Sequence, residues 1–195
     1  MSTAKLTLPE GVRKWHWTSE EFHRAFSMGL FRLDEKLELI DGEIIEKMGE
    51  DPSHSVGVGL AQDALAKAFA LTDCHLRIQH PIALPGGVSE PEPDVAVVRG
   101  QRRQYDKHHP QPVDTLLVVE VANTTLTYDR ERKAPAYAVA GVVEYWILNL
   151  TDRQLEVHRH PQNGAYQSTV ILTASQSASP MAMPTEIIRV ADLLP

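Results

Sequence analysis

Two acidic residues stand in or beside apolar runs that a protein of this size would bury. Glu120 interrupts the run 116–122, and Asp94 follows Pro93 at the head of the run 94–98. An ionised carboxylate loses several kcal/mol on transfer from water to an apolar interior, so Glu120 needs a cation, a proton or an exit to water. Carboxylates on two adjacent strands would form an oxygen-rich site for Mg²⁺ or Mn²⁺, which prefer such ligands.

A lysine follows Glu120 by thirteen residues, on a predicted helix that leaves the strand and packs back over it. The ammonium group of Lys133 can there approach a metal-bound water or a phosphate oxygen. Plainer interpretations exist for all three residues. Glu120 can lean into solvent or pair with an arginine, and Asp94 can cap a turn. Lys133 can be a solvated charge paired with Asp129 or Glu131, and the spacing does not choose between these interpretations.

These residues together resemble a known nuclease signature. Pro-Asp at positions 93–94 and Glu-Val-Ala at positions 120–122 are similar to the PD-(D/E)xK motif of restriction-endonuclease-like nucleases, with Ala122 where that motif normally holds lysine. Within that superfamily the chain resembles the Uma-two family of endonucleases, a domain of unknown function in which the lysine is displaced onto the following helix. Lys133 matches the displaced lysine. The similarity covers about residues 18–150 in order, through segments 38–43, His54, 92–95, 117–121, 128–130, Tyr137, 140–142 and 144–147.

The resemblance implies a magnesium-dependent endonuclease, with Mn²⁺ as the alternative ion, that hydrolyses the phosphodiester bonds of DNA. It assigns Asp94 and Glu120 as metal ligands and catalytic residues, with the carbonyl of Val121 as a further metal ligand. Lys133 would orient the attacking water or stabilise the transition state electrostatically. The implied fold is α/β, a restriction-endonuclease-like mixed β-sheet core flanked by helices, with additional β-hairpins.

Two further residues lie in matching segments and are auxiliary candidates for the site. Glu38 lies on a predicted hairpin, and His54 lies in the first turn of a predicted helix. Both also have structural interpretations. An outward hairpin edge would explain Glu38 together with Glu43, and a histidine such as His54 is usually structural or solvated.

The secondary structure expected from the sequence alternates between helices and strands. Asp41-Gly42 predicts a type I′ turn, and Asn163-Gly164 predicts a second hairpin. Continuous apolar character over 115–122 is typical of a central strand covered on both faces. The expected helices are 19–28, with a Thr18/Glu21 capping box, 52–71 and 129–140, and the expected strands are 36–40, 43–47, 74–84, 94–98, 115–122, 144–150, 155–160 and 165–172.

Charge decides how this chain could bind nucleic acid. The net charge of −7 and the pI near 5.7 argue against binding through overall basicity. A local basic loop over 99–112 is the alternative, with Arg99, Arg102, Arg103 and Lys107 as candidate contacts to a phosphate backbone beside Asp94. The same loop can also be a solvated surface segment.

Length and composition restrict the remaining classes. The 195 residues fit an N-terminal extension over 1–17 and one domain over 18–195. The single cysteine, Cys74, excludes an internal disulfide and a cysteine zinc cluster, and the nine histidines do not predict a dedicated zinc site. The longest apolar runs are too short to cross a bilayer, and no signal-peptide core is present, so we expect a cytoplasmic protein.

Other interpretations stay open at this point. The nuclease fold could be a catalytically silent module that binds nucleic acid or a protein partner. A two-carboxylate glycosidase is a further alternative, although it gives Lys133 no role. The apolar stretch 15–17 and exposed strand edges make a homodimer plausible.

Overall fold

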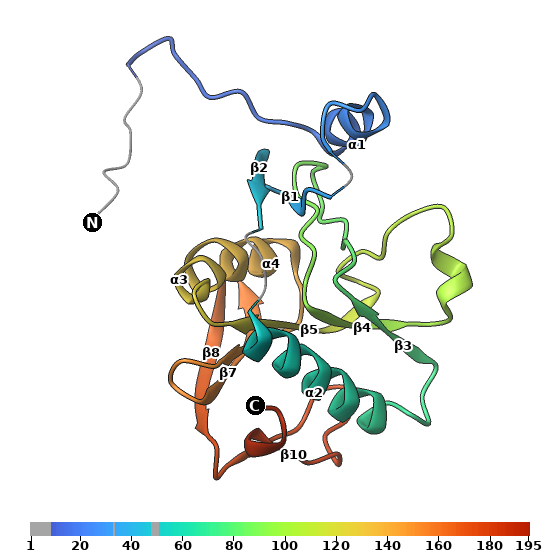
Figure 1. Ribbon diagram of the computed structural model, residues 1–195, viewed down its shortest axis with the longest axis vertical. Helices are drawn as coiled ribbons and strands as arrows, with labels where there is room; N and C mark the ends of the chain where they lie inside the picture. Colours follow the sequence, from blue (N-terminus) through green and yellow to red (C-terminus); the bar gives the residue numbers. More distant parts are fainter. Residues whose placement is uncertain (1–8, 33, 48–50) are drawn as a thin grey trace.

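The computed structural model describes residues 9–32, 34–47 and 51–195, which form a mixed sheet flanked by helices (Figure 1). The helices are α1 (Ser19–Ser27), α2 (Pro52–Ala68), α3 (Leu126–Tyr128) and α4 (Ala134–Ala140). The strands are β1 (Leu37–Ile40), β2 (Glu43–Glu46), β3 (Cys74–Ile78), β4 (Val95–Arg99), β5 (Thr115–Ala122), β6 (Glu144–Asn149), β7 (Gln154–Gln162), β8 (Ala165–Thr173), β9 (Ser177–Ala178) and β10 (Ile188–Arg189). Short 3₁₀ turns cover Arg102–Tyr105 and Val190–Asp192.

The central sheet has six strands in the order β3-β4-β5-β6-β7-β8. β5 and β6 run parallel, and the other neighbouring pairs run antiparallel. A parallel pair needs a crossover, and α3 and α4 supply it between β5 and β6. The predicted α/β class and mixed sheet are therefore confirmed. No described helix has both the length and the apolar character required to cross a membrane.

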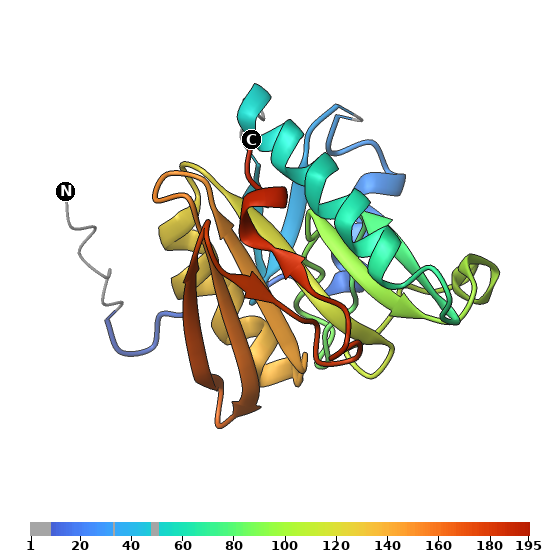
Figure 2. The ribbon, with the colours of Figure 1, turned by 90° about the horizontal axis from the view of Figure 1, so that it is seen from below.

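Both faces of the sheet are covered, as the apolar run in β5 predicted. Every residue of β5 is buried. Leu117, Val119 and Val121 belong to the core formed with α2 and the C-terminal segment, whereas Val118 and Ala122 belong to the core formed with α4. Figure 2 shows α2 and the C-terminal turn on one side of the sheet and α3 and α4 on the other. Because side chains alternate along a strand, Glu120 faces the α4 side.

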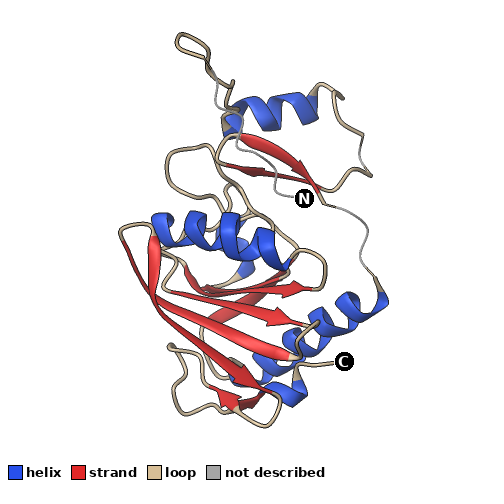
Figure 3. Cartoon of the chain, turned by 90° about the vertical axis from the view of Figure 1, so that its left-hand side faces the viewer, coloured by secondary structure: helices blue, strands red, loops and turns tan. Residues whose placement is uncertain are grey.

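The N-terminal helix and the first hairpin form one end of the molecule (Figure 3). The predicted capping box of α1 is present, and the turn between β1 and β2 has positive φ at Asp41 (51°) and Gly42 (75°). A small core joins Phe22 of α1 to Leu37 and Leu39 of β1. All four residues of β1 are buried, Leu37 and Leu39 in this small core and Ile40 in the core on the α4 side of the sheet.

The strand predicted over 74–84 is too long. β3 ends at Ile78, and residues 79–94 return to β4 as an irregular segment. Gln79 has φ of +51°, and prolines at 81 and 85 lack the N–H that a ladder requires. Ile82 and Leu84 are nevertheless buried against the α4 side of the sheet. Helix α2 likewise ends at Ala68, before the predicted residue 71.

The helix predicted over 129–140 is interrupted at its start. A π-helical turn covers Asp129–Lys133, and α4 follows directly. In a regular helix the ring of Pro135 would clash with the carbonyl of Glu131, so a wider turn at this point relieves the crowding. Gly141 ends α4 with φ of +84°, as predicted.

An ion pair fixes this π-helical turn to the sheet. Arg130 donates to both carboxylate oxygens of Glu156 on β7, with nitrogen–oxygen distances of 2.9 and 2.5 Å. Asn149 donates to the same carboxylate at 3.3 Å. Burial acts to raise the pKa of Glu156, but the nearby His158, 3.8 Å away, and hydrogen bonds from Arg130 and Asn149 outweigh it and lower the pKa to about 2.

The lowered pKa of Glu156 predicts how stability changes in acid. A carboxyl whose pKa is lower in the folded state stabilises the fold above its unfolded pKa, and that contribution is lost as pH falls to its folded pKa. We therefore expect Glu156→Gln to lower the free energy of unfolding at pH 7. The difference from the wild type should shrink as pH falls from about 4.5 toward 2. Urea denaturation across this range tests it, and a constant difference would contradict it.

Candidate active site

A cavity of about 340 Å³ opens where β4, β5, α2 and the first hairpin meet. It contains all six residues that the sequence assigned to the metal and catalytic centre, namely Glu38, His54, Asp94, Glu120, Val121 and Lys133. The rest of its lining is Ile45, Glu46, Lys47, Asp51, Asn123, Thr124, Thr125, Tyr128 and Asp129. The fold thus brings together residues that are far apart in the sequence.

Asp94 directly precedes β4 in the chain, and it lines the cavity. Because Val95 pairs with Val119 of β5, Asp94 lies beside Glu120. Its Oδ2 accepts a hydrogen bond from the backbone N–H of Val121 at 2.8 Å and lies 3.2 Å from Nε2 of His54. Burial acts to raise the pKa of Asp94, but these bonds and the charges of Lys47 and His54 outweigh it and lower the pKa. Asp94 is therefore held as a carboxylate.

Glu120 lies on β5, an inner strand of the sheet whose residues are all buried. Its Oε1 accepts hydrogen bonds from Lys133 Nζ at 2.8 Å and from the hydroxyl of Tyr137 at 3.0 Å. Burial raises the pKa of Glu120 to about 8, and the neighbouring Asp94 also acts to raise it, while Lys133 opposes both. Because the charge of Lys133 already contributes to this value, the carboxyl carries a full negative charge at neutral pH only when a further cation lies beside it.

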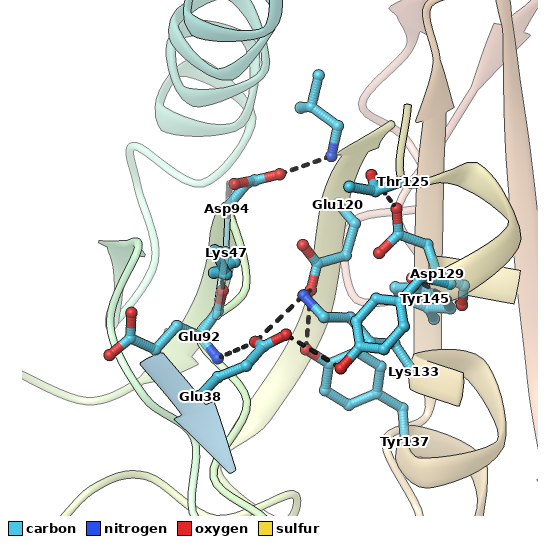
Figure 4. Close-up of polar contacts among 12 residues, drawn as sticks. Glu38, Lys47, Glu92, Asp94, Glu120, Thr125, Asp129, Lys133, Tyr137 and Tyr145 are labelled. Atoms are coloured by element: carbon cyan, nitrogen blue, oxygen red, sulfur yellow. Dashed lines mark hydrogen bonds and ion pairs between the residues drawn. The ribbon is translucent and has the colours of Figure 1, made fainter. Parts of the chain in front are cut away.

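Lys133 lies between two acidic groups from different elements. The ammonium group is 2.8 Å from Glu120 on β5 and 3.3 Å from Glu38 on β1 (Figure 4). Lys133 is only 2% exposed, so its interpretation as a solvated surface charge is wrong. Burial acts to lower its pKa, but the charges of Glu120, Glu38 and Asp129 outweigh it and raise the pKa well above its usual value. Lys133 is therefore held protonated.

Glu38 is buried and takes part in the same network. Besides its ion pair with Lys133, it accepts hydrogen bonds from the backbone N–H of Glu92 at 3.2 Å and from the hydroxyl of Tyr128 at 3.4 Å. The structural interpretation of Glu38 as an outward hairpin edge is wrong. Its neighbour Glu43 is only partly buried and pairs with Arg132 at 2.9 Å, so the structural interpretation fits that residue.

His54 lies in the first turn of α2, and the cap of this helix fixes its position. Asp51 caps this helix by accepting a hydrogen bond from the backbone N–H of His54 at 2.9 Å. Its other oxygen accepts from Asn123, in the loop after β5, at 2.6 Å. Hydrogen bonds from Ser53, His54 and Asn123 lower the pKa of Asp51, so the cap stays charged. The helix start is thereby tied to the end of the strand that carries Glu120.

The sequence analysis gave no role to several residues of this network. Tyr137 lies in a segment that resembles the family, and its hydroxyl donates a hydrogen bond to Glu120. Asp129 is buried beside the cavity and accepts a hydrogen bond from Thr125 at 2.7 Å. Lys47 donates to the backbone carbonyl of Glu92 at 2.7 Å. Lys133 and Tyr137 are four residues apart, a spacing that places both on one face of a helix. This spacing is the sequence signal that could have identified Tyr137 as a second partner of Glu120.

The basic loop does not reach this cavity. Arg99 and Asp94 lie at opposite ends of β4, roughly 15 Å apart by the rise of a strand. Of the residues that line the cavity, none belongs to the loop over 99–112. Arg99 borders a separate depression together with Asp73, Tyr105, His108 and Asp114. Phosphate binding by Arg99, Arg102, Arg103 and Lys107 stays a prediction.

The architecture matches that of a protein of known structure. A crystal structure described as "a putative nuclease belonging to DUF820" from Anabaena variabilis matches with a TM-score of 0.70, covering 90% of this chain and 96% of that chain at 16% sequence identity. The Uma2 family model, described as "Putative restriction endonuclease", matches residues 19–191. The chain therefore belongs to the Uma2 family, which confirms the resemblance noted in the sequence. No curated protein matches this chain.

Other expectations are not addressed by the family match or the fold. The family model begins one residue after the predicted domain start at residue 18. The division into an extension of residues 1–17 and a domain of residues 18–195 stays a prediction. The homodimer and the cytoplasmic location likewise stay predictions.

Removing the buried ammonium group should be costly. In Lys133→Met, Glu38 and Glu120 lose their shared cation while both stay buried. We expect the free energy of unfolding to fall by about 3–5 kcal/mol, the usual effect of breaking a buried ion pair. Adding Glu120→Gln should recover part of the loss, because one unpaired charge is removed as well. Chemical denaturation measures both.

Lys67→Met is the matched control, because Lys67 is an exposed helical lysine. Its free energy of unfolding should change by less than about 0.5 kcal/mol. An equally small change in Lys133→Met would contradict the role given to the buried network.

Proposed function

We propose that the protein is an endonuclease that uses Mg²⁺ or Mn²⁺ to hydrolyse phosphodiester bonds of DNA. The observation that carries the proposal is the meeting of Asp94, Glu120 and Lys133 in one cavity. Membership of a family described as restriction endonuclease supports nucleic acid as the substrate and DNA as its type. The carboxylates and the ammonium group then have distinct tasks.

The donor atoms suit a hard divalent cation. Asp94 and Glu120 present carboxylates from neighbouring strands, and we assign the carbonyl of Val121 as a third ligand. Burial raises the pKa of Glu120, so this group gains most from an added positive charge. When bound, Mg²⁺ or Mn²⁺ would lower the pKa of a water molecule and neutralise charge on phosphate oxygens.

The protein's own residues position and charge the site. Lys133, held protonated, provides a fixed positive charge that stabilises negative charge growing on the phosphate in the transition state. Glu38 and Tyr137 hold Lys133 and Glu120 in place through hydrogen bonds and the ion pair. His54 contacts Asp94 and keeps that carboxylate oriented toward the cavity. A low-dielectric surrounding strengthens each of these interactions.

Cleavage of DNA by the purified chain tests the proposal. We expect supercoiled plasmid to be nicked in the presence of Mg²⁺ or Mn²⁺ and not in the presence of EDTA. Asp94→Asn and Glu120→Gln should each lower the rate by at least about 100-fold, because each removes charge from the metal site. Gel analysis over time measures the rate on duplex and single-stranded DNA.

Glu131→Gln is the matched control, since it removes one negative charge from an exposed position near Lys133. This variant should keep the rate of the wild type. DNA binding without cleavage under every metal condition would contradict the proposal and favour the silent binding module. Equal rates in the wild type, Asp94→Asn and Glu120→Gln would also contradict it.

A further inference from the structure

A second group of metal-ligating side chains lies outside the cavity. His23 on α1, Glu90 in the segment 79–94 and His109 in the basic loop each offer a ligand atom, and these atoms lie within 4.8 Å of one another. Within the described ranges 9–32, 34–47 and 51–195, these three side chains form a group whose ligand atoms are close enough to share one ion. We propose that these three residues form a second metal site, selective for a divalent transition ion such as Zn²⁺.

The types of ligand favour zinc over magnesium. Two imidazole nitrogens and one carboxylate oxygen are a known ligand set for Zn²⁺ and leave a position for water. Mg²⁺ prefers oxygen ligands and keeps most of its waters, so it suits Asp94 and Glu120 better. The two sites share no residue, because His23, Glu90 and His109 do not line the cavity.

Contacts with neighbouring residues hold the carboxylate of Glu90 beside His23. Its side chain is only 8% exposed and contacts Nε2 of His23 at 2.7 Å through Oε2. Its backbone N–H donates to the carbonyl of Leu39 at 2.7 Å, in an isolated bridge to β1. A buried carboxylate with an imidazole as neighbour has strong electrostatic attraction for a cation.

His109 is the third member of the group. Its ring stacks at 6.1 Å from the ring of His23. The neutral imidazole is the form of histidine that binds a metal. Arg77 lies 3.5 Å from Nδ1, a long contact that a metal can replace.

A metal at this position would connect three distant parts of the chain. It would join α1 and the basic loop to the segment that leads from Glu90 to Asp94. Within the same segment, Glu92 donates its backbone N–H to Glu38. Bound Zn²⁺ would thus stabilise the fold and the backbone on which the proposed active site depends. The inference rests on the geometry of these three residues and does not depend on the proposed nuclease activity.

Zinc titration of the full chain tests this site separately from the cavity. The background is Asp94→Asn combined with Glu120→Gln, which removes the carboxylates of the first site. In this background we expect one Zn²⁺ per chain by isothermal titration calorimetry and a higher Tm in the presence of Zn²⁺. Adding His109→Ala or His23→Ala should weaken zinc binding by at least about tenfold and remove the rise in Tm.

His108→Ala is the matched control, because it deletes the neighbouring histidine of the same loop and should leave zinc binding unchanged. His23 has a side chain that is 53% exposed, so its replacement leaves the fold intact. Equal zinc affinity in all the histidine variants would identify adventitious binding only and overturn the proposal. Absence of zinc binding in the background variant would also overturn it, whatever the result of the DNA assay.

Discussion

The buried ammonium group of Lys133 is the constraint on which the rest of the structure depends. Glu120 in a central strand and Glu38 on the hairpin are both almost fully buried. Lys133 contacts both, at 2.8 and 3.3 Å, and so joins the sheet, the crossover helix and the hairpin in one network. The cost of burying charge makes this arrangement cooperative, because removal of one member leaves the others unpaired.

Part of this arrangement could be predicted from the sequence. A glutamate in an uninterrupted apolar strand indicated a buried charge, and alternation along β5 placed it on the face of Val118 and Ala122. The spacing to Lys133 was compatible with both a buried and a solvated lysine. The outcome depends on the π-helical turn before Pro135 and on the hairpin that brings Glu38 to the ammonium group. The long-range contact between Glu38 and Lys133 has no local signal in the sequence.

The irregular segment 79–94 explains the main error in the predicted secondary structure and much of the site. Its apolar residues and neighbouring strands favoured a longer β3, but its prolines and the positive φ of Gln79 prevent it from pairing as a strand. Instead it carries Glu90, Glu92 and Asp94 past α1, the hairpin and β5 in turn. A segment without regular structure thus determines where three acidic residues lie.

Location of the metal most directly tests the central claim that Asp94 and Glu120 form one cation site beside Lys133. Crystals of the full chain soaked in Mn²⁺ allow an anomalous difference map to be measured. The account predicts a peak between the two carboxylates, at about 2.0 to 2.6 Å from an oxygen of each. A well-ordered map with no peak at these carboxylates would contradict it.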